Sequence, residues 1–377
     1  MPQLKRNLGV FGAIAISLAA MGPTMSVSLN PQAIAQQVNS AVPTAFLLAV
    51  IPLGLIAGSF VLLTKRSASA GSVFGLVRAE LGPRSGTAAG VWLVAAYIAC
   101  VAVTALSFGI FSATLMSGLG WVSSPQWLPI LLAFIVLPIT AYLAGRTMRA
   151  LGHALLILEG LTMTAILVVA VITLTKLITT GGPQGQYVEW SAFRLDGVTA
   201  GALALALTFA LLSSAGFEGA AAVGEETRNP RKAIPLALIW TIVLTSAFFI
   251  FVTTIAVWAF GTAPNQMQKF VASGSLPADI ANLYVSAGIG DFITLGGAIS
   301  SFACMIALQV AGGRIIYALA RDGIVPSRLQ VLSPRDTPVV ASLVVGTIAF
   351  ILVIFAATGS PPRNAILHQP RTRSGSH

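Results

Sequence analysis

Two glutamates stand inside long apolar stretches, where an acidic side chain is costly. Glu218 follows a run of small and hydroxylated residues, and Glu159 lies within the run Leu-Ile-Leu-Glu-Gly-Leu. A carboxyl group in the middle of a membrane usually marks a functional position. It can take up and release a proton there, so both residues are candidates for proton coupling. The alternative for each is a structural carboxyl group that only bonds a neighbouring segment.

The apolar stretch at residues 8–36 contains a helix-breaking sequence. Met21, Gly22, Pro23 and Thr24 interrupt it near its middle. Proline has no N–H group and clashes with the preceding turn, so a helix should stop and restart here.

A second break is predicted in the stretch at residues 198–223. The segment is Ser213-Ser214-Ala215-Gly216-Phe217, in which the small and hydroxylated residues permit local unwinding. Interrupted helices at corresponding places in two halves of a chain point to the binding site of a membrane transporter.

A broken helix presents the partial charges of its free N–H and carbonyl groups to a ligand. The N-terminal end of the second half-helix attracts an anion, so the N–H groups near Gly22, Thr24 and Ser26 could hold a carboxylate. The carbonyl groups at residues 213–215 could hold an amine. The alternative is that both breaks only serve helix packing. Tyr97 and Leu308 either line the same cavity or pack in the core.

Composition places the chain in the membrane. It has 377 residues, of which 56% are hydrophobic and 8% charged. An ordinary soluble domain carries about 25% charged residues. The net charge of +10 is spread singly or in pairs between apolar stretches, which argues against a nucleic-acid partner. No HExxH, GxSxG or P-loop sequence is present, so we expect no enzyme, metal or cofactor. Cys100 and Cys304 are expected to pack as small apolar residues.

Apolar stretches predict an all-α polytopic membrane protein with nine spans. A span needs about 20 apolar residues. The predicted spans are residues 8–36, 43–64, 86–118, 127–145, 150–178, 198–223, 234–260, 286–320 and 338–358. With a cytoplasmic N-terminus, most Lys and Arg residues before the tail fall on the cytoplasmic side, and only Lys176, Arg194 and Lys269 fall outside. This predicts a cell-membrane location.

Three sequence motifs resemble the amino acid–polyamine–organocation (APC) permease superfamily. The most specific is SAGFEG at residues 214–219 with GEETRNPRKAIP at 224–235. RIIYALARDGIVP at 314–326 is similar to the end of that family's eighth span. A weaker match joins residues 69–74 to Leu81-Gly82-Pro83. The matches lie in order from about residue 8 to residue 358.

The resemblance implies a fold of two inverted five-span repeats, of the LeuT type. Residues 8–178 would form the first repeat and 198–358 an incomplete second one, within a single domain at 1–358. The family usually has twelve spans, so we expect a C-terminally truncated chain with an aberrant or disordered tail at 359–377. Substrate would lie between spans 1, 3, 6 and 8. Glu218 matches the family's proton-sensitive acid in span 6, and Glu159 stands where one branch has a lysine.

The resemblance also implies a function. We expect a secondary transporter of amino acids or related amines, working by proton symport or exchange, in the lipid bilayer and possibly as a homo-oligomer. Two alternatives remain at this point: a truncated membrane protein that does not transport, and a sensor that binds substrate without moving it.

Overall fold

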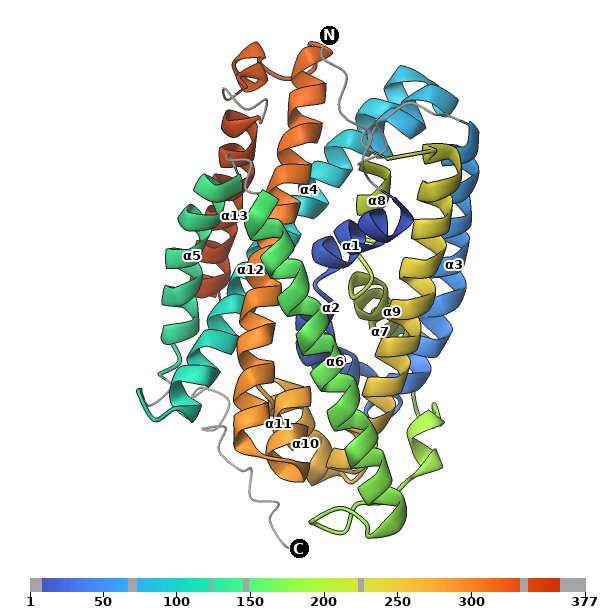
Figure 1. Ribbon diagram of the computed structural model, residues 1–377, viewed down its shortest axis with the longest axis vertical. Helices are drawn as coiled ribbons and strands as arrows, with labels where there is room; N and C mark the ends of the chain where they lie inside the picture. Colours follow the sequence, from blue (N-terminus) through green and yellow to red (C-terminus); the bar gives the residue numbers. More distant parts are fainter. Residues whose placement is uncertain are drawn as a thin grey trace, which may run out of the picture.

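Long apolar helices make up most of the protein. The computed structural model describes residues 9–66, 73–122, 125–144, 149–222, 227–332 and 338–359. The helices run mostly along the long axis of the molecule (Figure 1). They are α1 (Val10–Met21), α2 (Pro23–Val38), α3 (Val42–Arg66), α4 (Val73–Gly118), α5 (Leu128–Ala144), α6 (Arg149–Thr179), η1 (Trp190–Phe193), α7 (Ala200–Leu212), α8 (Gly219–Ala222), α9 (Pro230–Phe260), α10 (Pro264–Ala272), α11 (Leu276–Tyr284), α12 (Ala287–Arg321), η3 (Ser327–Gln330) and α13 (Val339–Gly359).

Every predicted span coincides with one or two of these helices. Among the described residues, six helices are long and apolar enough to cross a membrane: α3, α4, α6, α9, α12 and α13. The pair α1 and α2 meets that standard together and is bent by 40°, while α5 and α7 are shorter apolar helices. Large apolar side chains such as Leu55, Trp92 and Phe355 are 71%, 77% and 68% exposed. An apolar surface of this extent suits contact with lipid.

Two features differ from the sequence-based expectation. The third span begins at Val73 rather than at residue 86, because the helix continues through a kink at Gly82. Gly82 has φ +85° and ψ +173°, which is not helical, so α4 consists of two helices that meet at this residue, and Pro83 lies in the first turn of the second. The short helices α10 and α11 were not predicted. The tail at 360–377 and the motif residues 223–226 lie outside the described residues.

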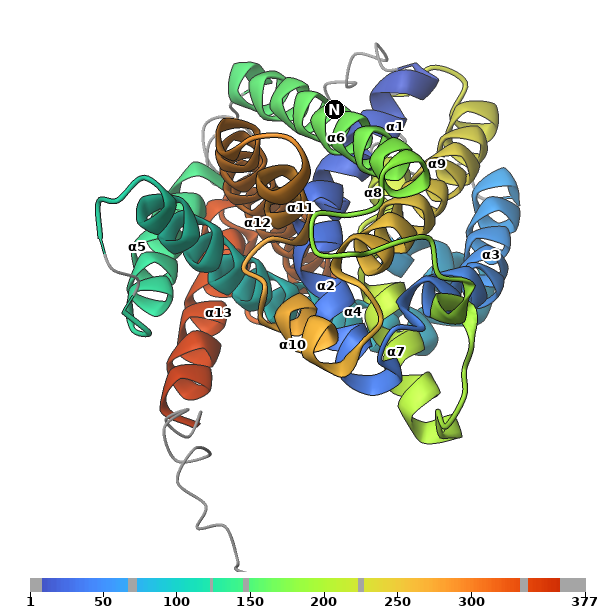
Figure 2. The ribbon, with the colours of Figure 1, turned by 90° about the horizontal axis from the view of Figure 1, so that it is seen from below.

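The helices pack as two groups. One hydrophobic core joins α1, α2, α3, α6 and α7 to α9, α10 and α11, and a second joins α4, α5, α12 and α13. Contacts pair helices at corresponding positions of the two predicted repeats: α2 packs against α7, α3 against α9, α4 against α12 and α5 against α13. Figure 2 shows α5 and α13 at one side of the molecule, and α3 and α9 at the other. Both broken spans belong to the first group, and they border the second, because α12 contacts α1 and α2.

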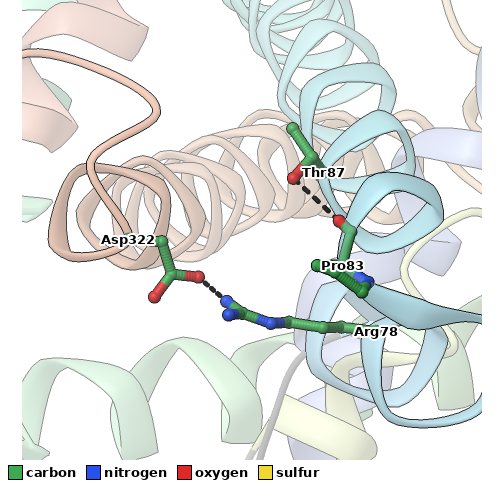
Figure 3. A network of polar contacts seen from close by, with 4 residues as sticks. All are labelled: Arg78, Pro83, Thr87 and Asp322. Carbon is green, nitrogen blue, oxygen red and sulfur yellow. Dashed lines mark hydrogen bonds and ion pairs between the residues drawn. The ribbon is translucent and has the colours of Figure 1, made fainter.

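An ion pair joins the kinked start of α4 to the end of α12. The guanidinium group of Arg78 contacts the carboxylate of Asp322, the residue that directly follows α12 (Figure 3). Arg78 also lies over the Phe74 ring, 5.9 Å from its centroid. Past the kink, the Thr87 hydroxyl donates to the Pro83 carbonyl at 2.9 Å. The pair holds together two helices of the same group.

We predict a small stabilising effect for this ion pair. Asp322→Asn should lower the free energy of unfolding by at most about 1 kcal/mol, because exposed ion pairs contribute little; Arg78 is 43% exposed. Thermal unfolding in detergent measures the change, and Arg84→Gln is the exposed control. Exchange of the two residues, as Arg78→Asp with Asp322→Arg, should recover part of the loss. A double variant no better than the sum of the single variants would contradict a direct interaction.

Candidate functional site

The first broken span is divided by a single glycine. Gly22 adopts φ +56° and ψ +62°, a left-handed conformation that ends α1 and precedes Pro23, the first residue of α2. Its N–H group donates to the Leu18 carbonyl at 3.1 Å. A Cβ atom at Gly22 would lie only 3.2 Å from the Ser300 hydroxyl and 3.3 Å from the Cys304 Cβ atom. The break thus lies directly against α12.

The second broken span unwinds over the residues predicted from the sequence. Helix α7 ends at Leu212, and a series of turns leads to α8 at Gly219. Gly216 has φ +102°, which other residues rarely adopt. The Ser213 hydroxyl donates to the Phe209 carbonyl and accepts from the Asn30 amide of α2 at 2.8 Å. This amide ties the second half of the first broken span to the break in the other.

The two breaks are in direct contact. A Cβ atom at Gly216 would lie 2.7 Å from both the carbonyl carbon and the carbonyl oxygen of Ala20, so only glycine allows this approach. The Ser17 hydroxyl donates to the Phe217 carbonyl at 2.7 Å and accepts from the Ala220 N–H group at 2.9 Å. One side chain of α1 therefore satisfies two backbone groups freed by the second break.

Glu159 reaches the first break from α6. Its side chain is 5% exposed. One carboxylate oxygen accepts the Thr24 N–H group, in the first turn of α2, at 2.9 Å. The Ser300 hydroxyl lies beside the same carboxyl group and also accepts the Met25 N–H group at 3.3 Å. An internal carboxylate thus occupies the positive end of α2.

Glu218 lies at the second break and is half-buried. One carboxylate oxygen accepts the Tyr97 hydroxyl of α4 at 2.9 Å, and the other accepts the Gly216 N–H group at 3.1 Å. The residue therefore connects the unwound segment to the opposite helix group. Either bond can change when the carboxyl group binds a proton.

The remaining predicted site residues lie at or near the two breaks. Met21, Pro23 and Ser26 are buried, and the Ser26 hydroxyl donates to the Met21 carbonyl at 3.2 Å. Phe217 packs edge-on against Phe60, with ring centroids 5.5 Å apart. The other predicted residues are Ser214, which is buried, Ala215, which is exposed, and Leu308, which is buried one turn beyond Cys304 on α12.

Sequence reasoning missed several polar groups that hold the site together. Ser17, Asn30, Ser300 and Cys304 all contact one of the breaks. The Cys304 thiol donates to the Ala20 carbonyl at 3.0 Å, so it is more than an apolar filler. The available signal was the four-residue spacing of Ser300 and Cys304, which places both on one face of a helix.

The unpredicted helices α10 and α11 cover the end of α2. The Gln32 amide of α2 donates to the Ser273 carbonyl between them at 3.2 Å, and the Ser273 hydroxyl donates to Asp279 at 2.6 Å. Prolines at the first turns of both helices were the signal for them.

Burial raises the pKa of the Asp279 carboxyl group, while the bond from Ser273 lowers it. Because the raised pKa means that folding strengthens proton binding at Asp279, this residue lowers the stability of the folded state increasingly as the pH rises above the usual pKa of an aspartate.

The polar groups gathered at the two breaks are of the kinds that could bind a small polar ligand. They include carbonyl groups, two carboxylates and hydroxyl groups next to unwound backbone. No group of three or more His, Cys, Asp or Glu side chains in the described part of the chain is arranged to hold a metal ion.

Comparison with known proteins assigns the class. A family model described as amino acid permease matches residues 8–367. The chain therefore belongs to the amino acid permease family, and its resemblance to the APC superfamily is confirmed. It is a multi-pass membrane permease.

Individual relatives are distant but align along most of the chain. The branched-chain amino acid permease BcaP of Lactococcus lactis is 22% identical, over 91% of this chain and 74% of its own length. The low-affinity putrescine importer PlaP of Escherichia coli K12 is 23% identical, over 94% of this chain and 75% of its own length. The crystal structure of MhsT in complex with L-phenylalanine superposes with a TM-score of 0.63 at 18% identity, covering 95% of this chain and 80% of MhsT. This likeness shows a shared fold.

We predict that Ser17→Ala destabilises the protein by about 1–3 kcal/mol, because it leaves the Phe217 carbonyl and the Ala220 N–H group buried without partners. Thermal unfolding in detergent measures the loss. Ser59→Ala is the matched control, since Ser59 is exposed and bonds only the Leu55 carbonyl of its own helix. Equal stability of the two variants would show that Ser17 does not hold the breaks together.

Proposed function

We propose that this protein is a secondary active transporter that moves amino acids or related amines across the cell membrane, with its N-terminus in the cytoplasm. Residues 1–358 form one transport domain, with repeats at 8–178 and 198–358. Transport proceeds by proton symport or by exchange.

The contact of the two breaks is the observation that carries this proposal. Gly216 abuts the Ala20 carbonyl between the two helix groups, so a ligand held by one broken span also touches the other. Helix pairing supports the repeats, because each helix of the first half from α2 to α5 packs against its counterpart in the second. Relative movement of the two groups would open the site to one side of the membrane and then to the other.

The names of the relatives support the substrate class. BcaP is a permease for branched-chain amino acids, and PlaP imports putrescine. Both substrate types carry an ammonium group. A cation of that kind suits carbonyl groups beside a carboxylate.

Glu218 is suited to couple a proton to this movement. In its charged form the carboxylate accepts from both Tyr97 and the Gly216 N–H group. A proton on the oxygen that faces Gly216 would leave it a poorer acceptor for that N–H group. The unwound segment would then be released from the carboxyl group. Glu159 is the second candidate, through its bond to the Thr24 N–H group.

We predict that Glu218→Gln abolishes the dependence of transport on the proton gradient. Proteoliposomes that contain the protein are loaded at alkaline pH, diluted into acidic buffer and assayed for uptake of a labelled mixture of amino acids and amines. Wild-type uptake should collapse when the gradient is dissipated. The variant should retain exchange of substrate at equal pH but gain nothing from the gradient.

Tyr97→Phe is the matched control, because it removes the hydroxyl group but leaves the carboxyl group. It should remain gradient-dependent with a shifted pH profile. A Glu218→Gln protein that still accumulates substrate with the proton gradient would exclude the coupling role. Wild-type uptake driven by a sodium gradient alone would exclude proton coupling altogether.

A further inference from the structure

We infer that the site prefers amines without a carboxylate over the corresponding α-amino acids. This inference rests on the proposed transport function and narrows its substrate class. It follows from how the hydrogen-bonding groups of the two breaks are already used.

The N–H groups at the first break are all occupied. Gly22 donates to the Leu18 carbonyl, Pro23 has no N–H group, and Ser26 donates to the Gly22 carbonyl. The two remaining donors are taken by other helices: Thr24 donates to Glu159, and Met25 donates to the Ser300 hydroxyl. A substrate carboxylate could reach the Thr24 N–H group only by displacing the Glu159 carboxyl group, and the Thr24 hydroxyl, which is buried without a hydrogen-bond partner among the described residues, is the donor that remains at this turn.

The acidic side chains near the breaks also favour an amine over an amino acid. Glu159 is the one acidic side chain buried in the described part of the chain, and no Lys or Arg is buried there. Glu218 adds a second carboxyl group at the adjoining break. A substrate carboxylate would therefore meet two acidic groups and no fixed cation to stabilise it, whereas an ammonium group would find carboxyl oxygens as acceptors.

The second break offers acceptors to such an ammonium group. Among the described residues, no donor reaches the carbonyl oxygens of Ser213 and Ala215. Ala215 is exposed, and the Glu218 side chain is half-buried three residues further on. An ammonium group has three N–H donors and no acceptor, so carbonyl oxygens and a carboxylate match it.

The test compares pairs of substrates that differ only in the α-carboxylate. The pairs are putrescine with ornithine, cadaverine with lysine, and 3-methylbutylamine with leucine. Initial uptake of each labelled compound into proteoliposomes is measured over a range of concentrations, with empty liposomes as the blank. In each pair we expect kcat/KM for the amine to exceed that for the amino acid by at least about tenfold.

Substitutions of Glu159 test the cause of the preference. Glu159→Ala frees the Thr24 N–H group and removes the carboxyl group beside it, so amino acid uptake should rise and the preference should fall by about tenfold. Glu159→Gln retains an oxygen acceptor for that N–H group, so its preference should stay closer to wild type. An identical shift in the two variants would contradict the role given to the hydrogen bond. If Glu159→Ala fails to fold, the wild-type pairs and Glu159→Gln decide.

The outcomes separate this inference from the proposed function. Uptake of amino acids equal to or better than that of their amines would overturn the inference and leave the permease intact. Uptake of none of the six compounds, in vesicles shown to contain folded protein, would overturn both.

Discussion

The structure depends on satisfying the backbone groups that two broken helices expose inside a membrane. An unpaired N–H or carbonyl group in an apolar interior costs several kcal/mol, so a break survives only where other groups complete it. Here the two breaks complete each other. Ser17 serves the Phe217 carbonyl and the Ala220 N–H group, and Asn30 bonds Ser213. Glu159 and Ser300 serve the first turn of α2. At the second break the carbonyl oxygens of Ser213 and Ala215 receive no donor from the described residues, and these acceptors underlie the proposed preference for an ammonium group.

The same constraint explains how the two helix groups are connected. The broken spans belong to one hydrophobic core, yet their polar contacts reach α12 and α4 of the other. Tyr97 holds Glu218, and Cys304 holds the Ala20 carbonyl. These bonds cross the boundary between the groups, so any relative movement must break or exchange them. A ligand or a proton that changes the bonding of Glu218 therefore acts at the boundary where movement is needed.

Much of this architecture could be predicted from the sequence. Long apolar stretches indicate membrane spans, and glycine and proline within them indicate helix breaks. Gly22-Pro23 and the run that ends at Gly216 divide their helices where expected. The partners could not be predicted. Ser17 and Ser300 are two serines among many, and only the packing of α1 against α12 and α8 places them at the breaks. The third span was expected to begin at residue 86, after the Gly82-Pro83 pair. The segment before this pair is also helical, so the pair produces a kink between two helices. Short amphipathic helices such as α10 and α11 carry too weak an apolar signal to stand out among spans.

The proposed site depends on the close approach of Gly216 to Ala20, which brings the two breaks into contact. Replacing Gly216 by alanine puts a methyl group 2.7 Å from the Ala20 carbonyl oxygen, whereas Gly201 of the adjoining α7 has nothing within 4 Å of such a group. The decisive measurement is substrate uptake into proteoliposomes by Gly216→Ala and Gly201→Ala proteins, incorporated at equal amounts. We expect near-complete loss of uptake in the Gly216→Ala protein and wild-type uptake in the Gly201→Ala protein. Wild-type uptake by Gly216→Ala would show that the two breaks need not touch, and would contradict the site as described.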